Sequence, residues 1–212
     1  APQLDNPFSQ HQHKTDVVPD RLRQPPFFDP HADDAVNYGG VGAVIGHEMT
    51  PGFDDQGAQY DAQGNLKNWW SPSDLEKFKH GTGLVASQFD AYTVLDTATH
   101  VNGKLTLGEN LADLGGLSVS YAALEKALAQ KGRPANIDGF TPEQRFFLAW
   151  AQIWRSNTTP EAARLRINTD PHSPGEWRTN GPLSNLPQFA AAFGCKPGDA
   201  MVRPESVRPV IW

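Results

Sequence analysis

Apolar residues recur at helical spacing through most of the chain, and this pattern predicts a mainly helical protein. The first apolar stripe begins near Asp33 and ends near Pro51. Four glycines fall inside it: Gly39, Gly40, Gly42 and Gly46. Each glycine weakens a helix by roughly 1 kcal/mol relative to alanine. We therefore expect a packing reason for them, because small residues let another backbone or a ligand come close.

Start and stop signals predict the remaining helices. Ser71-Pro72 begins a helix that runs to about Tyr92, and a third helix runs from near Glu109 to Lys131, where Gly132 ends it. Thr141-Pro142-Glu143-Gln144 is a capping box for a fourth helix. Short helices are expected at about residues 160–168 and 184–193. No long alternating pattern typical of strands occurs, so the predicted fold class is mainly α, of the α+β type.

The first part of the chain differs in composition from the rest. Residues 1–30 contain six prolines and a polar run, which is typical of an irregular lead-in on the surface. Within it, Phe27 and Phe28 are expected to hold the segment against the body of the protein. Residues 31–212 are predicted to form one domain.

Charge and hydropathy narrow the classes of partner. The 212-residue chain has a net charge of −6, and no predicted helix carries a basic stripe, which argues against nucleic acid. No apolar run approaches the ~20 residues that a membrane span needs. The polar start lacks the apolar core of a secretory signal, so we expect a mature product or a fragment.

One motif carries chemistry. In H-E-x-x-H, two histidines on one helix face bind a single Zn²⁺, and the glutamate takes a proton from the zinc-bound water. Here the pattern reads His47-Glu48-Met49-Thr50-Pro51. The first histidine and the glutamate are present, and proline stands at the place of the second histidine. Proline has no lone pair for a metal and no amide proton for a helix.

Several further motifs, in the same order along the chain, resemble the neprilysin family of zinc endopeptidases, in particular its bacterial members. They are Gln24 to Pro30, Val44 to Asp55, Gly57 to Trp70, Gly108 to Asp113, His172 to Arg178, and the closing Val210-Ile211-Trp212. The resemblance covers about residues 17–212 and implies a thermolysin-like zincin catalytic segment. Family members are much longer, so it also implies that an N-terminal, largely helical domain is missing. That missing part is a possible partner, and an extracytoplasmic location, periplasmic or secreted, is favoured.

The resemblance also implies roles for single residues. His47 and Glu109 match zinc ligands, and Glu48 matches the catalytic base. Asp113 matches the carboxylate that orients a ligating histidine. His172 matches the group that stabilises the oxyanion, and Arg178 matches the group that binds a substrate carbonyl. Zinc is the implied cofactor, and small peptides are the implied substrates.

Two departures from the family pattern affect these expectations. Pro51 replaces the second zinc histidine, which leaves His47 and Glu109 as the only matched ligands. The family's substrate-binding segment, Asn-Ala-Tyr-Tyr, has no match upstream, where Pro2-Gln3-Leu4-Asp5 stands. We expect proline to end or bend the helix that carries His47, and helix packing to bring His47, Glu48, Glu109 and Asp113 into one cleft.

Three functions remain open from the sequence. The first is a zinc metalloendopeptidase whose activity is impaired or absent because the metal is poorly held. The second is a peptide-binding pseudo-peptidase in which His172 and Arg178 grip a peptide without cleaving it. The third is an inactive fragment of a longer peptidase. Without the surrounding motifs, Glu109 and Asp113 would be read as a solvated helix start, and His172 and Arg178 as loop residues.

Overall fold

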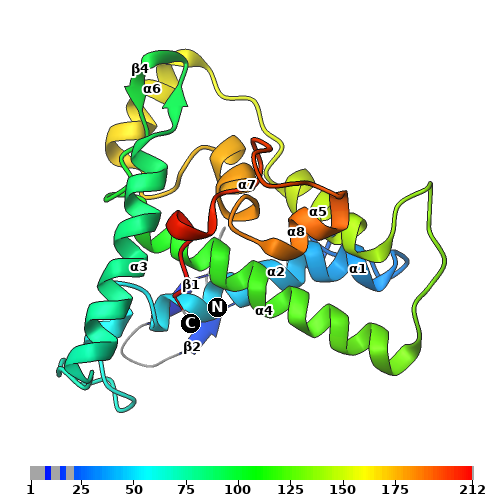
Figure 1. The fold of residues 1–212 in the computed structure, drawn as a ribbon, viewed down its shortest axis with the longest axis horizontal. Coiled ribbons are helices and arrows are strands. Elements are labelled where there is room, and N and C mark those ends of the chain that lie inside the picture. The colour runs from blue at the N-terminus through cyan, green and yellow to red at the C-terminus, as the bar shows by residue number, and fades with distance from the viewer. Residues whose placement is uncertain (1–7, 11–14, 18–21, 212) are drawn as a thin grey trace.

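The computed structural model describes residues 8–10, 15–17 and 22–211. The predicted mainly helical fold is confirmed: helices account for most of the described chain, and the strands are short (Figure 1). The α-helices are α1 Asp34–Asn37, α2 Ala43–Met49, α3 Pro72–Asp90, α4 Leu107–Lys131, α5 Pro142–Ile153, α6 Pro160–Thr169, α7 Gly175–Leu183 and α8 Pro187–Phe193. The strands are β1 Phe8–Gln10, β2 Thr15–Val17, β3 Thr93–Val94 and β4 Asp96–His100.

The glycine-rich first stripe is one continuous helical segment, but not a uniform α-helix. A π-helix, Tyr38–Gly42, separates α1 from α2, and a 3₁₀-helix, Thr50–Gly52, follows α2. The expected end of the helix at Pro51 is confirmed. Because Pro51 has no amide proton to donate to the carbonyl of His47, the amide of Thr50 donates to that carbonyl instead and tightens the last turn.

The expected packing reason holds for Gly46, which lies where α2 crosses α4 (Figure 1). A Cβ on Gly46 would lie 2.9 Å from the Cα of Gly116, and a Cβ on Gly116 would lie 2.5 Å from the carbonyl oxygen of Ala43. The two backbones therefore touch at this point, with no side chain between them. This contact sets α2 against the first turns of α4.

At most of the other helices, the start or end predicted from the sequence agrees with the structure. Ser71 caps α3, Gly132 ends α4 at φ 89°, and Thr141 and Gln144 form the predicted capping box of α5. The prediction of one helix over residues 184–193 was wrong at its start. The chain instead forms α7, which ends at Leu183, and α8, which begins at Pro187 because proline favours the first helical turn.

Two apolar clusters hold the helices together. The larger is built on α4 and α5, and its fully buried members include Leu117, Leu124, Phe146, Phe147 and Trp150. The smaller joins α3 to the start of α4 through Val85, Phe89, Val101 and Leu111. Ile211, near the end of the chain, packs against both clusters.

Parts of residues 1–30 are described. β1 and β2 form a two-stranded antiparallel sheet, and the main-chain amide of Val41 donates to the carbonyl of Phe27, which ties the segment to the π-helix. Pro2-Gln3-Leu4-Asp5, which we compared with a substrate-binding segment, lies outside the described residues.

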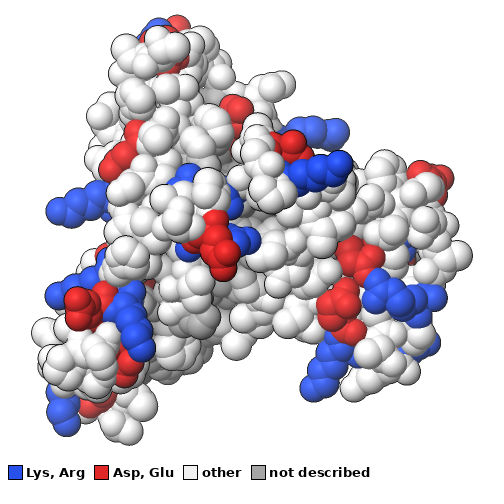
Figure 2. Space-filling view, in the orientation of Figure 1, with Lys and Arg blue, Asp and Glu red and all other residues white. Residues whose placement is uncertain are grey.

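Charged side chains of both signs are mixed on the surface. On the face drawn in Figure 2, Lys and Arg lie among Asp and Glu and form no continuous basic area. Among the residues described, no helix is both long enough and apolar enough to cross a bilayer.

Candidate functional site

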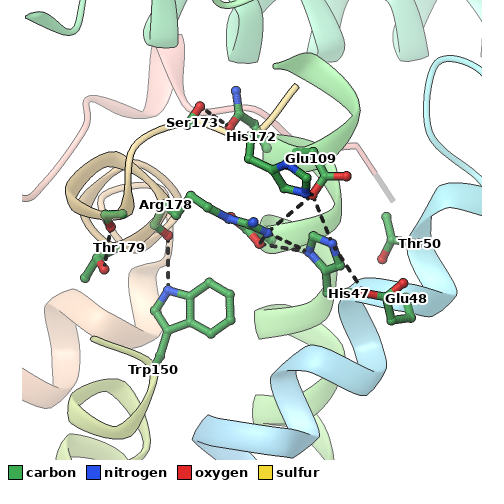
Figure 3. Close-up of polar contacts among 12 residues, drawn as sticks. His47, Glu48, Thr50, Glu109, Trp150, His172, Ser173, Arg178 and Thr179 are labelled. Carbon is green, nitrogen blue, oxygen red and sulfur yellow. Dashed lines mark hydrogen bonds and ion pairs between the residues drawn. The ribbon is translucent and has the colours of Figure 1, made fainter. Parts of the chain in front are cut away.

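A cleft of about 1160 Å³ runs beside the crossing of α2 and α4. All the residues singled out from the sequence except Asp113 line it: His47, Glu48, Pro51, Glu109, His172 and Arg178. Asp113 lies directly behind this surface and is fully buried. The expectation of one shared cleft is confirmed for His47, Glu48 and Glu109 (Figure 3). Asp113 does not line the cleft and contacts His47 from behind it.

His47 lies between two carboxylates. Its Nδ1 is 2.8 Å from Oδ1 of Asp113, and its Nε2 is 3.2 Å from Oε2 of Glu109. Burial alone would lower the pKa of His47, but the hydrogen bonds to Asp113 and Glu109 raise it to about 9. Without a metal, the imidazole is therefore protonated at neutral pH and donates to both carboxylates.

Asp113 is also paired with Arg178. Nε and Nη2 of Arg178 donate to Oδ2 and Oδ1 of Asp113 at 2.8 and 2.7 Å. Burial would raise the pKa of Asp113, but the charge of Arg178 holds it below the usual value. The carboxylate is therefore ionised, so it accepts from the Nδ1–H of His47 and leaves Nε2 facing the cleft.

Glu109 connects the two histidines of the site. Its Oε2 lies 3.2 Å from Nε2 of His47 and 3.3 Å from Nε2 of His172 (Figure 3). Burial acts to raise the pKa of Glu109, but the hydrogen bond to His47 and the nearby positive charges lower it overall. Glu48, on the other side of His47, has its Oε1 at 3.8 Å from Nε2 of His47.

α7 and the loop before it are anchored by aromatic and polar contacts. Trp177 stacks on Tyr92 at 3.9 Å and donates from Nε1 to the carbonyl of Thr93. The hydroxyl of Ser173 donates to Asn110, which is buried on α4. These contacts explain why His172 and Arg178, distant in sequence from His47, reach the same cleft.

Sequence reasoning missed two residues of the site. Asp170 accepts at Oδ1 from the main-chain amide of His172 and contacts its Nδ1 at 2.7 Å. Its place two residues before a histidine is a signal that could have identified it, since Asp commonly bonds the backbone two residues on. Trp154 lies under the guanidinium of Arg178, 3.8 Å from its ring centroid, and no sequence signal indicated this contact.

The arrangement agrees only in part with a zinc site. The 3.2 Å between Nε2 of His47 and Oε2 of Glu109 is close to the ~3.3 Å between two ligands of one tetrahedral zinc. Pro51 lines the same cleft and offers no donor atom. Across the described ranges, His, Cys, Asp and Glu form no group of three or more that could hold a metal ion. The residues present therefore do not complete a catalytic zinc site, which needs three protein ligands.

Comparison with known proteins supports the same family as the motifs. The profile of peptidase family M13 matches residues 6–208. Neprilysin-11 of Caenorhabditis elegans is 42% identical over 215 residues, covering 100% of this chain and 25% of its own length. Human endothelin-converting enzyme 1 is 42% identical over 198 residues, covering 92% of this chain and 25% of its own.

Solved structures agree with this fold. The zinc metalloprotease Zmp1 of Mycobacterium tuberculosis, crystallised with an inhibitor, superposes with a TM-score of 0.92 at 46% identity, over 98% of this chain and 32% of its own. The chain thus spans about a quarter of the curated relatives' length and a third of this structure. With the profile match extending over nearly all of its length, the chain belongs to peptidase family M13.

Proposed function

We propose that this chain is the part of a zinc metalloendopeptidase that carries the catalytic residues and acts on small peptides. We propose further that the form with Pro51 binds zinc weakly and cleaves peptides slowly or not at all. In this proposal His47 and Glu109 hold the metal, Glu48 is the general base, Asp113 orients His47, and His172 and Arg178 contact the peptide.

The observation that supports impairment is the contrast between Pro51 and its surroundings. His47, Glu48, Glu109 and Asp113 have converged with ligand-like spacing, yet the residue one turn after His47 has no donor atom. Losing even the partner of a metal ligand typically costs about 10–100-fold in affinity or activity. Losing a ligand itself should cost more. In the metal-free site the proton on His47 also competes with zinc, because only the neutral imidazole binds metal.

The second candidate function is peptide binding without cleavage. It is favoured by the cleft of about 1160 Å³, which stays open beside His172 although the ligand set is incomplete. His172 is 39% exposed in its side chain and can reach a ligand in that cleft.

The test compares the parent chain with Pro51→His and with Pro51→Ala. The alanine variant returns the amide proton without a ligand, so it separates the helix effect from the metal effect. After dialysis against zinc, we expect about one zinc per chain in Pro51→His and far less in the other two. A fluorogenic peptide assay and a peptide-affinity measurement on the same samples then distinguish impaired cleavage from binding alone. Near-stoichiometric zinc with turnover in the parent would overturn the proposal of impairment.

A further inference from the structure

Asp170 is held from two sides by different residues. Its Oδ1 accepts from the main-chain amide of His172 at 2.9 Å and lies 2.7 Å from Nδ1 of the same residue. Its Oδ2 accepts from Nε and Nη2 of Arg166, both at 2.8 Å. Burial would raise the pKa of Asp170, but these hydrogen bonds hold it below the usual value, so the carboxylate is ionised.

Arg166 belongs to a helix that contributes little to the core. No residue of α6 is buried, while Ala163, Arg166 and Ile167 line the cleft. In Figure 1, α6 lies beside the hairpin of β3 and β4, away from the larger helical core. The pair between Arg166 and Asp170 thus links this wall of the cleft to the loop that carries His172.

The consequence for His172 follows from the geometry of a carboxylate. A carboxylate bound at one oxygen only can rotate and exchange its two oxygens, whereas one bound at both keeps its plane. Because Arg166 occupies Oδ2, Oδ1 stays directed at His172 and accepts from its main-chain amide and its Nδ1–H, which fixes the orientation of the ring. Nε2 is then left facing Glu109 and the cleft, 3.3 Å from Oε2 of Glu109.

We propose that Arg166 is a positioning residue that fixes the imidazole of His172 through Asp170 and so couples α6 to the peptide-binding cleft. The part of this inference that concerns peptide binding rests on the proposed function. The part that concerns the orientation of His172 does not, and it is tested separately.

The experiment uses the full chain and three variants. Arg166→Ala removes the pair, Arg166→Lys keeps the charge without the planar fork, and Arg164→Ala changes an exposed arginine on the same helix that makes no contact with Asp170. The first measurement is the ¹⁵N chemical shifts of the two ring nitrogens of His172 at one fixed pH. The second is the affinity for a small peptide, and the third is Tm.

We expect the parent and Arg164→Ala to show the same pair of ¹⁵N shifts for His172. In Arg166→Ala the Nδ1 shift should change because the hydrogen bond from Nδ1 to Asp170 is no longer held in place, and Arg166→Lys should recover part of the difference. Peptide affinity in Arg166→Ala should fall about three- to tenfold, less than for loss of a direct partner of a functional group. Since the pair is exposed, Tm should change by no more than about 3 °C.

Identical His172 shifts in the parent and Arg166→Ala would overturn the inference. So would an equal change in Arg164→Ala, because the effect would then come from α6 in general. If no peptide binds the parent, the proposed function fails, and the His172 shifts still decide whether Arg166 positions the ring.

Discussion

Arg178 and Asp113 form an ion pair behind the cleft, with hydrogen bonds of 2.8 and 2.7 Å and almost no exposure of either side chain to water. Asp113 supplies the negative charge that holds His47, and Arg178 keeps that carboxylate ionised and in place. The three buried charges of His47, Asp113 and Arg178 therefore lie in direct contact with a partner of opposite sign.

The first prediction concerns this pair. Arg178→Gln removes the ion pair with Asp113 and leaves His47 as its remaining charged partner, and we expect a loss of about 3–5 kcal/mol in the free energy of unfolding. Lys131→Gln removes a pair with Asp34 in which the lysine side chain is 68% exposed, and it should cost less than about 1 kcal/mol. Urea unfolding of both variants measures the difference. Equal small losses would mean that Arg178 does not hold Asp113.

The second prediction concerns the contact of α2 with α4. In Gly116→Ala the new methyl group would lie 2.5 Å from the amide nitrogen of His47, so the helices must separate, and we expect a loss of more than about 3 kcal/mol. Gly83→Ala is the matched control, because a Cβ there meets nothing within 4 Å. It should stabilise the protein by about 0.5–1 kcal/mol. Similar thermal shifts in the two variants would contradict the close approach.

The third prediction concerns pH in the metal-free protein. The pKa of His47 is raised from 6.5 to about 9, so its contribution to stability is complete below pH 6.5 and is lost as pH rises through 9. The shift corresponds to about 3 kcal/mol as an order of magnitude. Urea unfolding with a chelator present should show this decline, and His47→Gln should remove it. The lowered pKa values of Glu109 and Asp113 act in the opposite direction, so their contribution disappears at acid pH.

The fourth prediction concerns stabilisation by zinc. At a free zinc concentration of about 100 times its Kd, a bound metal stabilises the folded state by about 2.7 kcal/mol. For a chain of this size that corresponds to a rise in Tm of about 5–10 °C. We expect such a rise in Pro51→His, measured by calorimetry, and almost none in the parent or Pro51→Ala. A rise of the same size in the parent would show that another group completes the metal site.

Much of the fold could be predicted because its signals are local. The capping box at Thr141 and Gly132, which has a positive φ, each decide a helix end within a few residues of sequence. Glu109 and Asp113 lie four residues apart in the helix predicted from near Glu109 to Lys131, so they share one face, and the structure brings both onto His47. The family motifs, rather than periodicity, connected these residues to His172 and Arg178.

What could not be predicted depends on contacts between distant segments. The π-helix at Tyr38–Gly42 has the same apolar and glycine pattern as an ordinary helix, and packing against other elements selects it. Asp113 accepts a hydrogen bond from Arg178, which lies 65 positions later in the chain. The stacking of Arg178 on Trp154 depends on how α5 packs against α7. No local sequence pattern predicts either contact.

The π-helix also fixes the direction in which His47 points. Each residue turns an α-helix by about 100°, and a π-turn accommodates one residue more than an α-turn of similar advance. The angular phase of α2 relative to α1 therefore depends on the number of residues between Asn37 and Ala43. Deleting one residue there, with both flanking helices held by their packing, would turn His47 by about 100° and direct its ring away from Asp113. The length of this glycine-rich stretch thus constrains the site as strictly as the identity of the residues that line it.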